Sequence, residues 1–218
     1  MRQKKKQFLV LGLGRFGKSV ARSLTELGHE VLAVDNDADA VAAAAEYVTQ
    51  SVQANCTDED TIRSFDPAGF DAAVVAIGTN VRDSVLACLL CKEAGAPLVI
   101  AKAMDELHGK LLSKIGVDRV IYPERDMGER LARSLTSPSV LDMMELSGDY
   151  RVAEVMAPAS WADRTLAEID VRRRYGVSVI GVRRGTDFLS APGADTRLAQ
   201  GDVLVAIGPE ESINELER

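Results

Sequence analysis

The sequence predicts an α/β protein: a Rossmann-like, doubly wound parallel sheet, then a helical connector and a small α+β lobe. Three observations support this. Short β-rich runs alternate with helical stretches over the first two thirds of the 218 residues. A glycine-rich loop, Gly12–Gly17, joins the first run to the first helical stretch. After Pro123 the alternation ends. We expect parts at residues 1–125, 126–148 and 149–218.

The first part should contain six strands, each a short apolar run suited to burial on both faces of a parallel sheet. They are expected at Phe8–Leu11, Glu30–Asp35, Tyr47–Gln53, Asp71–Ile77, Leu98–Lys102 and Arg119–Tyr122. The stretches between them supply crossover helices. Apolar residues recur at helical spacing in Lys18–Leu27 and again in Val81–Glu93, and Gly28 is a natural helix stop. Thr57 precedes three acidic residues, which is typical of a capped helix start.

The connector should hold two amphipathic helical segments, Met127–Leu135 and Val140–Leu146, with a turn at 136–139. The last part should contain short strands between Gly, Pro and Asp turns. These strands are expected at Val177–Arg183, Asp187–Ser190 and Asp202–Ile207, with short helices near Thr165–Ile169 and Glu210–Leu216.

Charge and composition argue against several classes of protein. Lys and Arg number 26 against 33 Asp and Glu, a net charge of −7, so no global basic field is present to hold nucleic acid. The basic run Arg2–Lys6 is interpreted as a solvated tail, with a contact to acidic lipid as the alternative. No stretch approaches the roughly 18 apolar residues of a membrane span, no signal pattern follows the lysines, and the three cysteines cannot all pair with one another. We therefore expect a cytoplasmic protein.

The glycine loop predicts a nucleotide site because it follows a strand and opens a helix. Gly12 permits a tight turn, Gly14 lets a phosphate approach the backbone, and Gly17 lets the helix pack closely on the strand. Asp35 ends the second strand, where its carboxylate can accept both ribose hydroxyls and would repel a 2′-phosphate. The alternative is an empty crevice in which the glycines serve packing alone.

Further charged and small residues are expected around the same crevice. Arg15 adds a positive charge where a pyrophosphate or triphosphate would lie, although a plain surface arginine is the alternative. The turn 76–80 ends the fourth strand and Lys102 ends the fifth, both at the edge where an open α/β sheet binds its ligand. A solvated strand-end lysine is the alternative for Lys102.

Residues suited to catalysis are scarce, since a dehydrogenase needs an acid or base beside its nicotinamide. His29 is expected on a turn surface, and His108 at a surface or interface. Cys88 and Cys91 lie within a helical pattern, which favours core packing over a zinc site. A redox switch would require an exposed thiolate of low pKa. The sequence therefore predicts a binding protein and no enzyme.

The chain resembles the cytoplasmic regulatory subunits of Ktr/Trk-type bacterial potassium transporters, which are built from N- and C-lobes of the RCK (regulator of potassium conductance) type. The segments that carry the resemblance are Gln7–Gly17, Gly28–Asp35, Val75–Asn80, Lys114–Arg119, Tyr122–Gly128 and Val171–Gly176. A single pair of lobes looks like the Ktr type.

The resemblance implies a nucleotide sensor whose dimers form an octameric ring beneath a membrane potassium channel or transporter subunit, at the inner face of the cell membrane. Exchange of ATP for ADP would change the shape of the ring, which requires that ATP contact the open-pore state better than ADP does. Arg15 matches the position at the γ-phosphate, Asp35 the ribose carboxylate and Lys102 a phosphate contact. Glu124 matches a residue that helps hold Mg²⁺ or another cation between two nucleotides at the dimer interface. The expected nucleotide-binding residues are Gly12, Gly14, Arg15, Phe16, Gly17, Asp35, Asn36, Asn55, Ala76, Ile77, Gly78, Asn80, Lys102 and Glu124.

Related C-lobes can bind cyclic di-AMP, and the matching positions here are Val171, Arg172, Ile180 and Pro192. For the arginine run Arg172–Arg174, the alternative is an ordinary solvated edge. Met127–Leu146 resembles helices that swap between neighbours in the dimer, with packing within one chain as the alternative. A small NAD-dependent oxidoreductase or NAD(H) redox sensor is the rival function, because NAD(H) uses the same loop and carboxylate. A transcriptional regulator is disfavoured by the acidic charge and by the lack of a visible helix-turn-helix.

Overall fold

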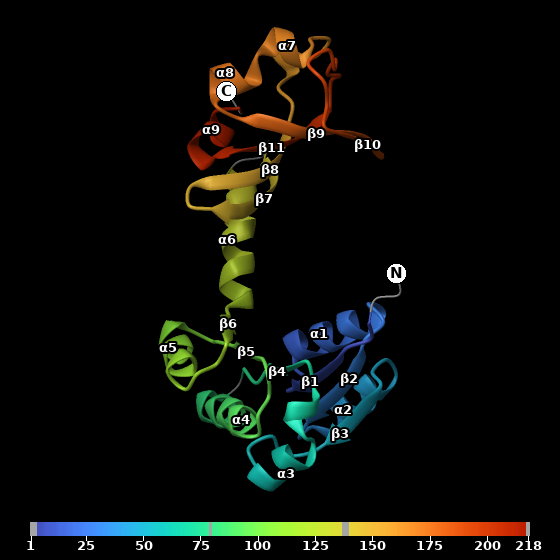
Figure 1. Ribbon diagram of the computed structural model, residues 1–218, viewed down its shortest axis with the longest axis vertical. Coiled ribbons are helices and arrows are strands. Elements are labelled where there is room, and N and C mark those ends of the chain that lie inside the picture. The colour runs from blue at the N-terminus through green and yellow to red at the C-terminus, as the bar shows by residue number, and fades with distance from the viewer. Residues whose placement is uncertain (1–3, 79, 137–139, 217–218) are drawn as a thin grey trace. The chain divides into compact units, whose positions relative to one another are not determined.

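The computed structural model describes residues 4–78, 80–136 and 140–216. The chain divides into two units, Met1–Glu124 and Arg125–Arg218, and each unit has its own sheet (Figure 1).

The first unit is built on a six-stranded parallel sheet in the order β3-β2-β1-β4-β5-β6. The strands are β1 (Gln7–Leu11), β2 (Glu30–Asp35), β3 (Gln50–Gln53), β4 (Ala72–Val75), β5 (Val99–Lys102) and β6 (Arg119–Ile121). Strands β1, β2 and β3 follow one another toward one edge of the sheet, and β4, β5 and β6 follow one another toward the other edge. The neighbours β1 and β4 therefore flank a topological switch point. The predicted doubly wound sheet is confirmed.

Crossover helices connect these strands (Figure 1). They are α1 (Arg15–Glu26), α2 (Ala38–Ala45), α3 (Glu59–Ser64), the 3₁₀ turn η1 (Pro67–Gly69), α4 (Val81–Glu93) and α5 (Glu106–Lys114). Four of these helices begin with a side-chain cap that accepts backbone N–H groups, namely Asp37, Asp58, Asn80 and Asp105. The N-cap of α1 is Gly14, which offers no side-chain acceptor, so the first N–H groups of the helix remain available to another acceptor.

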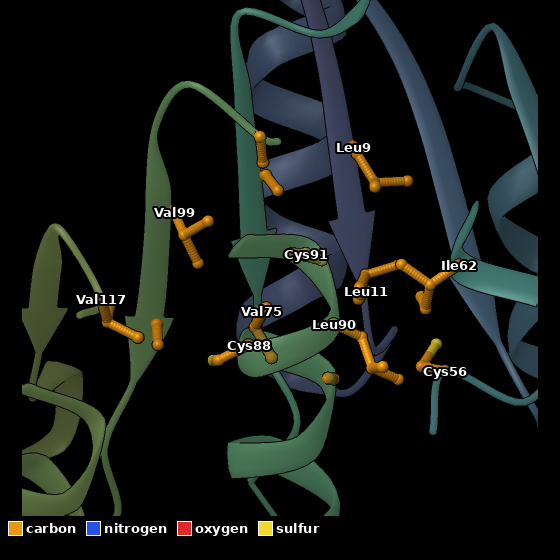
Figure 2. Packing of buried hydrophobic residues seen from close by; sticks show 14 of the residues in the cluster. Leu9, Leu11, Cys56, Ile62, Val75, Cys88, Leu90, Cys91, Val99 and Val117 are labelled. Carbon is orange, nitrogen blue, oxygen red and sulfur yellow. The ribbon is translucent and has the colours of Figure 1, made fainter. Parts of the chain in front are cut away.

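The two faces of the sheet are buried in separate apolar clusters, because alternate side chains of a strand point to opposite faces. In β1, Leu9 and Leu11 belong to the cluster packed against α3, α4 and α5, whereas Val10 belongs to the cluster packed against α1 and α2. Cys88 and Cys91 lie fully buried in the first of these clusters (Figure 2). This confirms their predicted role in core packing.

The second unit has a five-stranded antiparallel sheet in the order β10-β9-β11-β8-β7. Its elements are β7 (Val140–Ser147), β8 (Tyr150–Met156), the 3₁₀ turn η2 (Ala159–Trp161), α7 (Leu166–Ile169), α8 (Val171–Tyr175), β9 (Ser178–Arg184), β10 (Asp187–Ser190), β11 (Val203–Pro209) and α9 (Glu210–Glu215). Helix α6 (Pro123–Thr136) spans the junction of the two units. The core of the second unit gathers Val155, Trp161, Leu204 and Ile213.

The helix predicted at Val140–Leu146 is wrong, because this segment is strand β7. It pairs with β8 in a hairpin, with Met144 opposite Val152, and the chain turns through Gly148 at φ +55°. An apolar pattern this short fits either a helix or a strand, and the neighbouring strand decided between them by supplying backbone hydrogen-bond partners. Neither β8 nor α8 was predicted.

Smaller differences concern the ends of elements. Strand β3 begins at Gln50, because the N–H groups of Tyr47 and Val48 both donate to the carbonyl of Ala44 at the end of α2. The cap of α3 is Asp58 instead of Thr57. Of the predicted turn at 136–139, residues 137–139 lie outside the described part of the chain.

Among the residues that the structure describes, every helix is too short or too polar to cross a membrane.

Candidate functional site

A cavity of about 520 Å³ lies where β1, β2, β3 and β4 end. Its walls come from the loops that follow these strands and from the starts of α1, α2 and α4. An open α/β sheet binds ligands at this edge. The lining residues are Gly12, Leu13, Gly14, Arg15, Lys18, Asp35, Asn36, Asp37, Ala40, Asn55, Cys56, Thr57, Ala76, Ile77, Gly78 and Asp83.

Each of the three loop positions holds glycine for a different structural reason. Gly12 has φ +94°, a backbone conformation that favours glycine. A Cβ on Gly17 would overlap the carbonyl oxygen of Gly12, so Gly17 lets α1 pack against the loop. Gly14 has an ordinary φ of −65°, and a Cβ there would meet nothing within 4 Å. The backbone at Gly14 is thus open to a ligand.

The start of α1 combines free N–H groups with two cationic side chains. Gly14 is its N-cap and accepts from the N–H of Lys18 at 2.9 Å, without a side-chain cap. Arg15 and Lys18, in the first turn, both line the cavity. The helix dipole, the N–H groups and the two cations all favour an anion at this place.

Asp35 at the end of β2 holds two loops by their backbones. Its Oδ2 accepts from the N–H of Leu13 at 2.5 Å, and its Oδ1 accepts from the N–H of Asp37 at 2.9 Å. A carboxylate has about four acceptor positions, so about two remain for ribose hydroxyls.

Lys102 and Glu124 lie beside the cavity without lining it. Lys102 Nζ pairs with Glu124 Oε1 at 2.5 Å and would lie 3.4 Å from a Cβ on Gly78, a residue of the cavity wall. Lys102 is 14% exposed and Glu124 is 69% exposed. The hydrogen bond from Lys102 lowers the pKa of Glu124, and the charge of Arg15 contributes to the same shift. The structure therefore brings together the three charged residues Arg15, Lys102 and Glu124.

The other predicted residues divide into two groups. Asn36, Asn55, Ala76, Ile77 and Gly78 line the cavity, whereas Phe16, Gly17 and Asn80 do not. Asn80 caps α4, where its side-chain oxygen accepts from the N–H of Arg82 at 3.0 Å. Thr79 lies outside the described residues.

Sequence reasoning missed seven lining residues: Leu13, Lys18, Asp37, Ala40, Cys56, Thr57 and Asp83. Asp37 is the N-cap of α2, Asp83 lies in the first turn of α4, and Lys18 lies in the first turn of α1. The rule that ligands bind beyond the carboxyl ends of the strands would have found them, had it been applied to the first turn of each following helix.

Of the described cysteines and histidines, Cys56 alone lines the cavity. Burial raises the pKa of the Cys56 and Cys91 thiols to about 12, and it raises the pKa of Cys88 as well, so the thiols stay protonated. His108 was expected at a surface or interface, which is wrong: it is fully buried, its Nδ1 accepts from the N–H of Met104, and burial lowers its pKa. His29 packs edge-on against Phe8 at the opposite end of β1. The described residues contain no group of three or more His, Cys, Asp or Glu that could hold a metal ion.

In the second unit the four expected ligand residues differ in exposure. Val171 is buried in the core, and Arg172 is exposed on α8. Ile180 on β9 is half exposed, and its carbonyl accepts from the N–H of Ala191, the residue before Pro192. Ile180 and Pro192 are thereby neighbours.

Comparison with known proteins agrees with this architecture. The chain matches the TrkA-N domain over residues 8–123 and the TrkA-C domain over residues 151–218. It is 39% identical over 214 residues to Ktr system potassium uptake protein C of Bacillus subtilis, covering 98% of this chain and 97% of that protein. It is also 39% identical over 208 residues to Ktr system potassium uptake protein A of Vibrio alginolyticus, covering 95% and 94%. The GsuK channel superposes with a TM-score of 0.72 at 23% identity, covering 100% of this chain and 40% of that one, which supports the fold.

Proposed function

The chain belongs to the Ktr/TrkA family of potassium-uptake proteins, and from this premise we propose that its cavity senses ATP and ADP and so regulates a membrane potassium channel or transporter. The observation that carries the proposal is the uncapped start of α1, with Gly14 open to a ligand and Arg15 and Lys18 lining the cavity. This arrangement suits a chain of phosphates.

Three cationic side chains at or beside the cavity support a triphosphate over a shorter ligand, and a cation bound with the phosphates would also offset the lining aspartates Asp35, Asp37 and Asp83. Arg15 and Lys18 line the cavity, and Lys102 lies against its Gly78 wall. Glu124, the partner of Lys102, would be repelled by phosphates unless a cation lay between them. Mg²⁺ is commonly held by one or two carboxylates together with phosphate oxygens, so Glu124 suits Mg²⁺ or another cation carried by the nucleotide.

Regulation then follows from a population shift. ATP biases the open state of the pore only if it contacts that state better than ADP does. In this proposal dimers of the chain form an octameric ring at the inner face of the membrane, where each ring contacts the membrane subunit.

The second unit would add a cyclic di-AMP site near Arg172, Ile180 and Pro192.

A role in binding, not in catalysis, is supported by the same cavity. Neither histidine lines it, and Cys56, the cysteine that does, carries a protonated thiol. NAD(H) remains the rival ligand because Asp35 and the glycine loop suit its ribose and pyrophosphate equally well.

The test is calorimetric titration of the full chain with ATP, ADP and NADH, with and without Mg²⁺. Arg15→Ala should weaken ATP binding about tenfold and ADP binding less, as expected for one charge-assisted contact. Arg22→Ala is the matched control, because Arg22 lies on the same helix but stacks on the Tyr47 ring at 4.4 Å from its centroid. Tight NADH binding without an ATP response, or measurable hydride transfer, would overturn the proposal.

A further inference from the structure

We propose that Asp35 is a positioning residue for the glycine loop, so that its carboxylate supports phosphate binding even when the ligand has no ribose hydroxyls. The inference rests on the nucleotide site proposed above. It adds a second role to a carboxylate whose expected role is ribose recognition.

The contacts of Asp35 reach into the loop itself. Leu13 lies between Gly12 and Gly14, and its N–H donates to Asp35 Oδ2 at 2.5 Å. The N–H of Gly12 donates to the carbonyl of Val34 at 2.8 Å. The loop is therefore attached to the end of β2 at two points. The Asp35 side chain provides one of them, and the Val34 carbonyl provides the other. Because glycines have large conformational freedom, a restraint on Leu13 helps to keep the Gly14 backbone in its open position.

Asp35 also connects this loop to its neighbours. Its Oδ1 accepts from the N–H of Asp37 at 2.9 Å, and Asp37 in turn caps α2. The backbone carbonyl of Asp35 accepts from the N–H of Ala54, just beyond β3, at 2.9 Å. One residue thus joins the loops that follow β1, β2 and β3, all of which form walls of the cavity.

The charge of Asp35 makes the two roles separable by experiment. A carboxylate near phosphates repels them, so a residue that served the ribose alone would have no favourable effect on a nucleotide without ribose hydroxyls. Its removal would leave the affinity for such a nucleotide unchanged or increased. If Asp35 positions the loop, its removal must decrease that affinity.

The experiment compares ATP with 2′,3′-dideoxy-ATP on the full-length protein by calorimetry. Asp35→Ala should weaken dideoxy-ATP binding about tenfold, as expected for losing a backbone hydrogen bond to a charged group. Asp39→Asn is the matched charge control, because this carboxylate is exposed on α2 and does not line the cavity. Dideoxy-ATP affinity equal to or tighter than wild type in Asp35→Ala would overturn the proposal.

Hydrogen exchange at the Leu13 amide gives a second readout that does not depend on a ligand. It should be protected in the wild type and faster in Asp35→Ala, and unchanged exchange would overturn the proposal. If Asp35→Ala fails to fold, Asp35→Leu replaces it, since leucine keeps much of the side-chain volume but has no acceptor oxygen. A wild type that binds neither nucleotide would refute the proposed function, whereas the exchange result would still decide the role of Asp35.

Discussion

Gly14 and Gly17 lie three positions apart in one loop, yet a methyl group has different consequences at the two positions. At Gly17 it would overlap the Gly12 carbonyl oxygen, and at Gly14 it would meet nothing within 4 Å. Gly17 therefore serves the packing of α1, and Gly14 keeps the backbone accessible.

Gly17→Ala should therefore lower the free energy of unfolding by about 1–3 kcal/mol, the usual cost of overpacking. Gly14→Ala should change stability little but weaken ATP binding, because the new methyl group faces the space that a phosphate would occupy. Urea unfolding and calorimetry of both variants measure the two effects. Full ATP affinity in Gly14→Ala would contradict the assigned phosphate position.

The ion pair between Lys102 and Glu124 leads to a second prediction at the scale of single residues. We expect Mg²⁺ to raise the ATP affinity of the wild type about tenfold, and Glu124→Gln should abolish this gain. In the absence of the cation, the same variant should bind ATP as tightly as the wild type or more tightly. Because Lys102 lowers the pKa of Glu124, the carboxylate is ionised from pH 6 to 8, and the loss should not vary with pH over that range.

Calorimetry with and without Mg²⁺ checks this prediction. Glu129→Gln serves as the charge control, since Glu129 pairs with Arg125 on the surface of α6. An unchanged Mg²⁺ effect in Glu124→Gln would show that the cation is held without Glu124.

At the scale of elements, the junction of β9 and β11 depends on a buried carboxylate. Asp202, just before β11, is fully buried and accepts from Arg184 at the end of β9 at 2.7 and 2.8 Å. It also accepts from the N–H of Ala199 at 2.8 Å, which closes the turn before β11. The hydrogen bonds from Arg184 lower the pKa of Asp202.

Asp202→Asn should lower the free energy of unfolding at pH 7 by about 1.5–3 kcal/mol, as for other hydrogen bonds to charged groups. Because the folded pKa lies below the unfolded value of about 3.9, the contribution is complete above about pH 5 and declines as the pH falls toward the folded pKa. Denaturant unfolding at pH 7, 5 and 4 should thus show a difference between variant and wild type that narrows with acid. A difference that widened would refute the ionic role.

At the scale of the whole molecule, one face of α6 carries three apolar side chains with high exposure. Met127, Leu131 and Leu135 recur every four residues and are 60%, 58% and 72% exposed. Residues four apart lie on the same side of a helix. This stripe is consistent with a helix that packs against a second copy in the proposed ring.

Leu131→Glu should therefore lower the oligomeric mass in solution, because it places a charge in an apolar interface. Light scattering after size exclusion measures the mass, and circular dichroism confirms folding. Asp126→Glu is the control, since it changes α6 without altering the stripe. An unchanged mass for Leu131→Glu would exclude this face from the assembly.

The sequence predicted those parts of the fold and site that depend on local patterns. Strand β2, helix α4 and strand β10 have the predicted bounds, because apolar runs and helical spacing are properties of contiguous residues. The loop 12–17 and Asp35 were found for the same reason. Asn80 shows the limit of such reasoning, since a residue chosen for the ligand has its side-chain oxygen engaged in capping α4.

The sequence by itself determined the class of the sheet, the place of the nucleotide loop and the family resemblance, since each of these is written in short stretches of neighbouring residues. Only the tertiary structure decided that 140–146 is a strand, that His108 is buried, and that Arg15, Lys102 and Glu124 gather beside one cavity. These outcomes depend on residues distant in the chain. Hydrogen-bond partners, burial and charge proximity exist only once strands far apart in the sequence lie side by side.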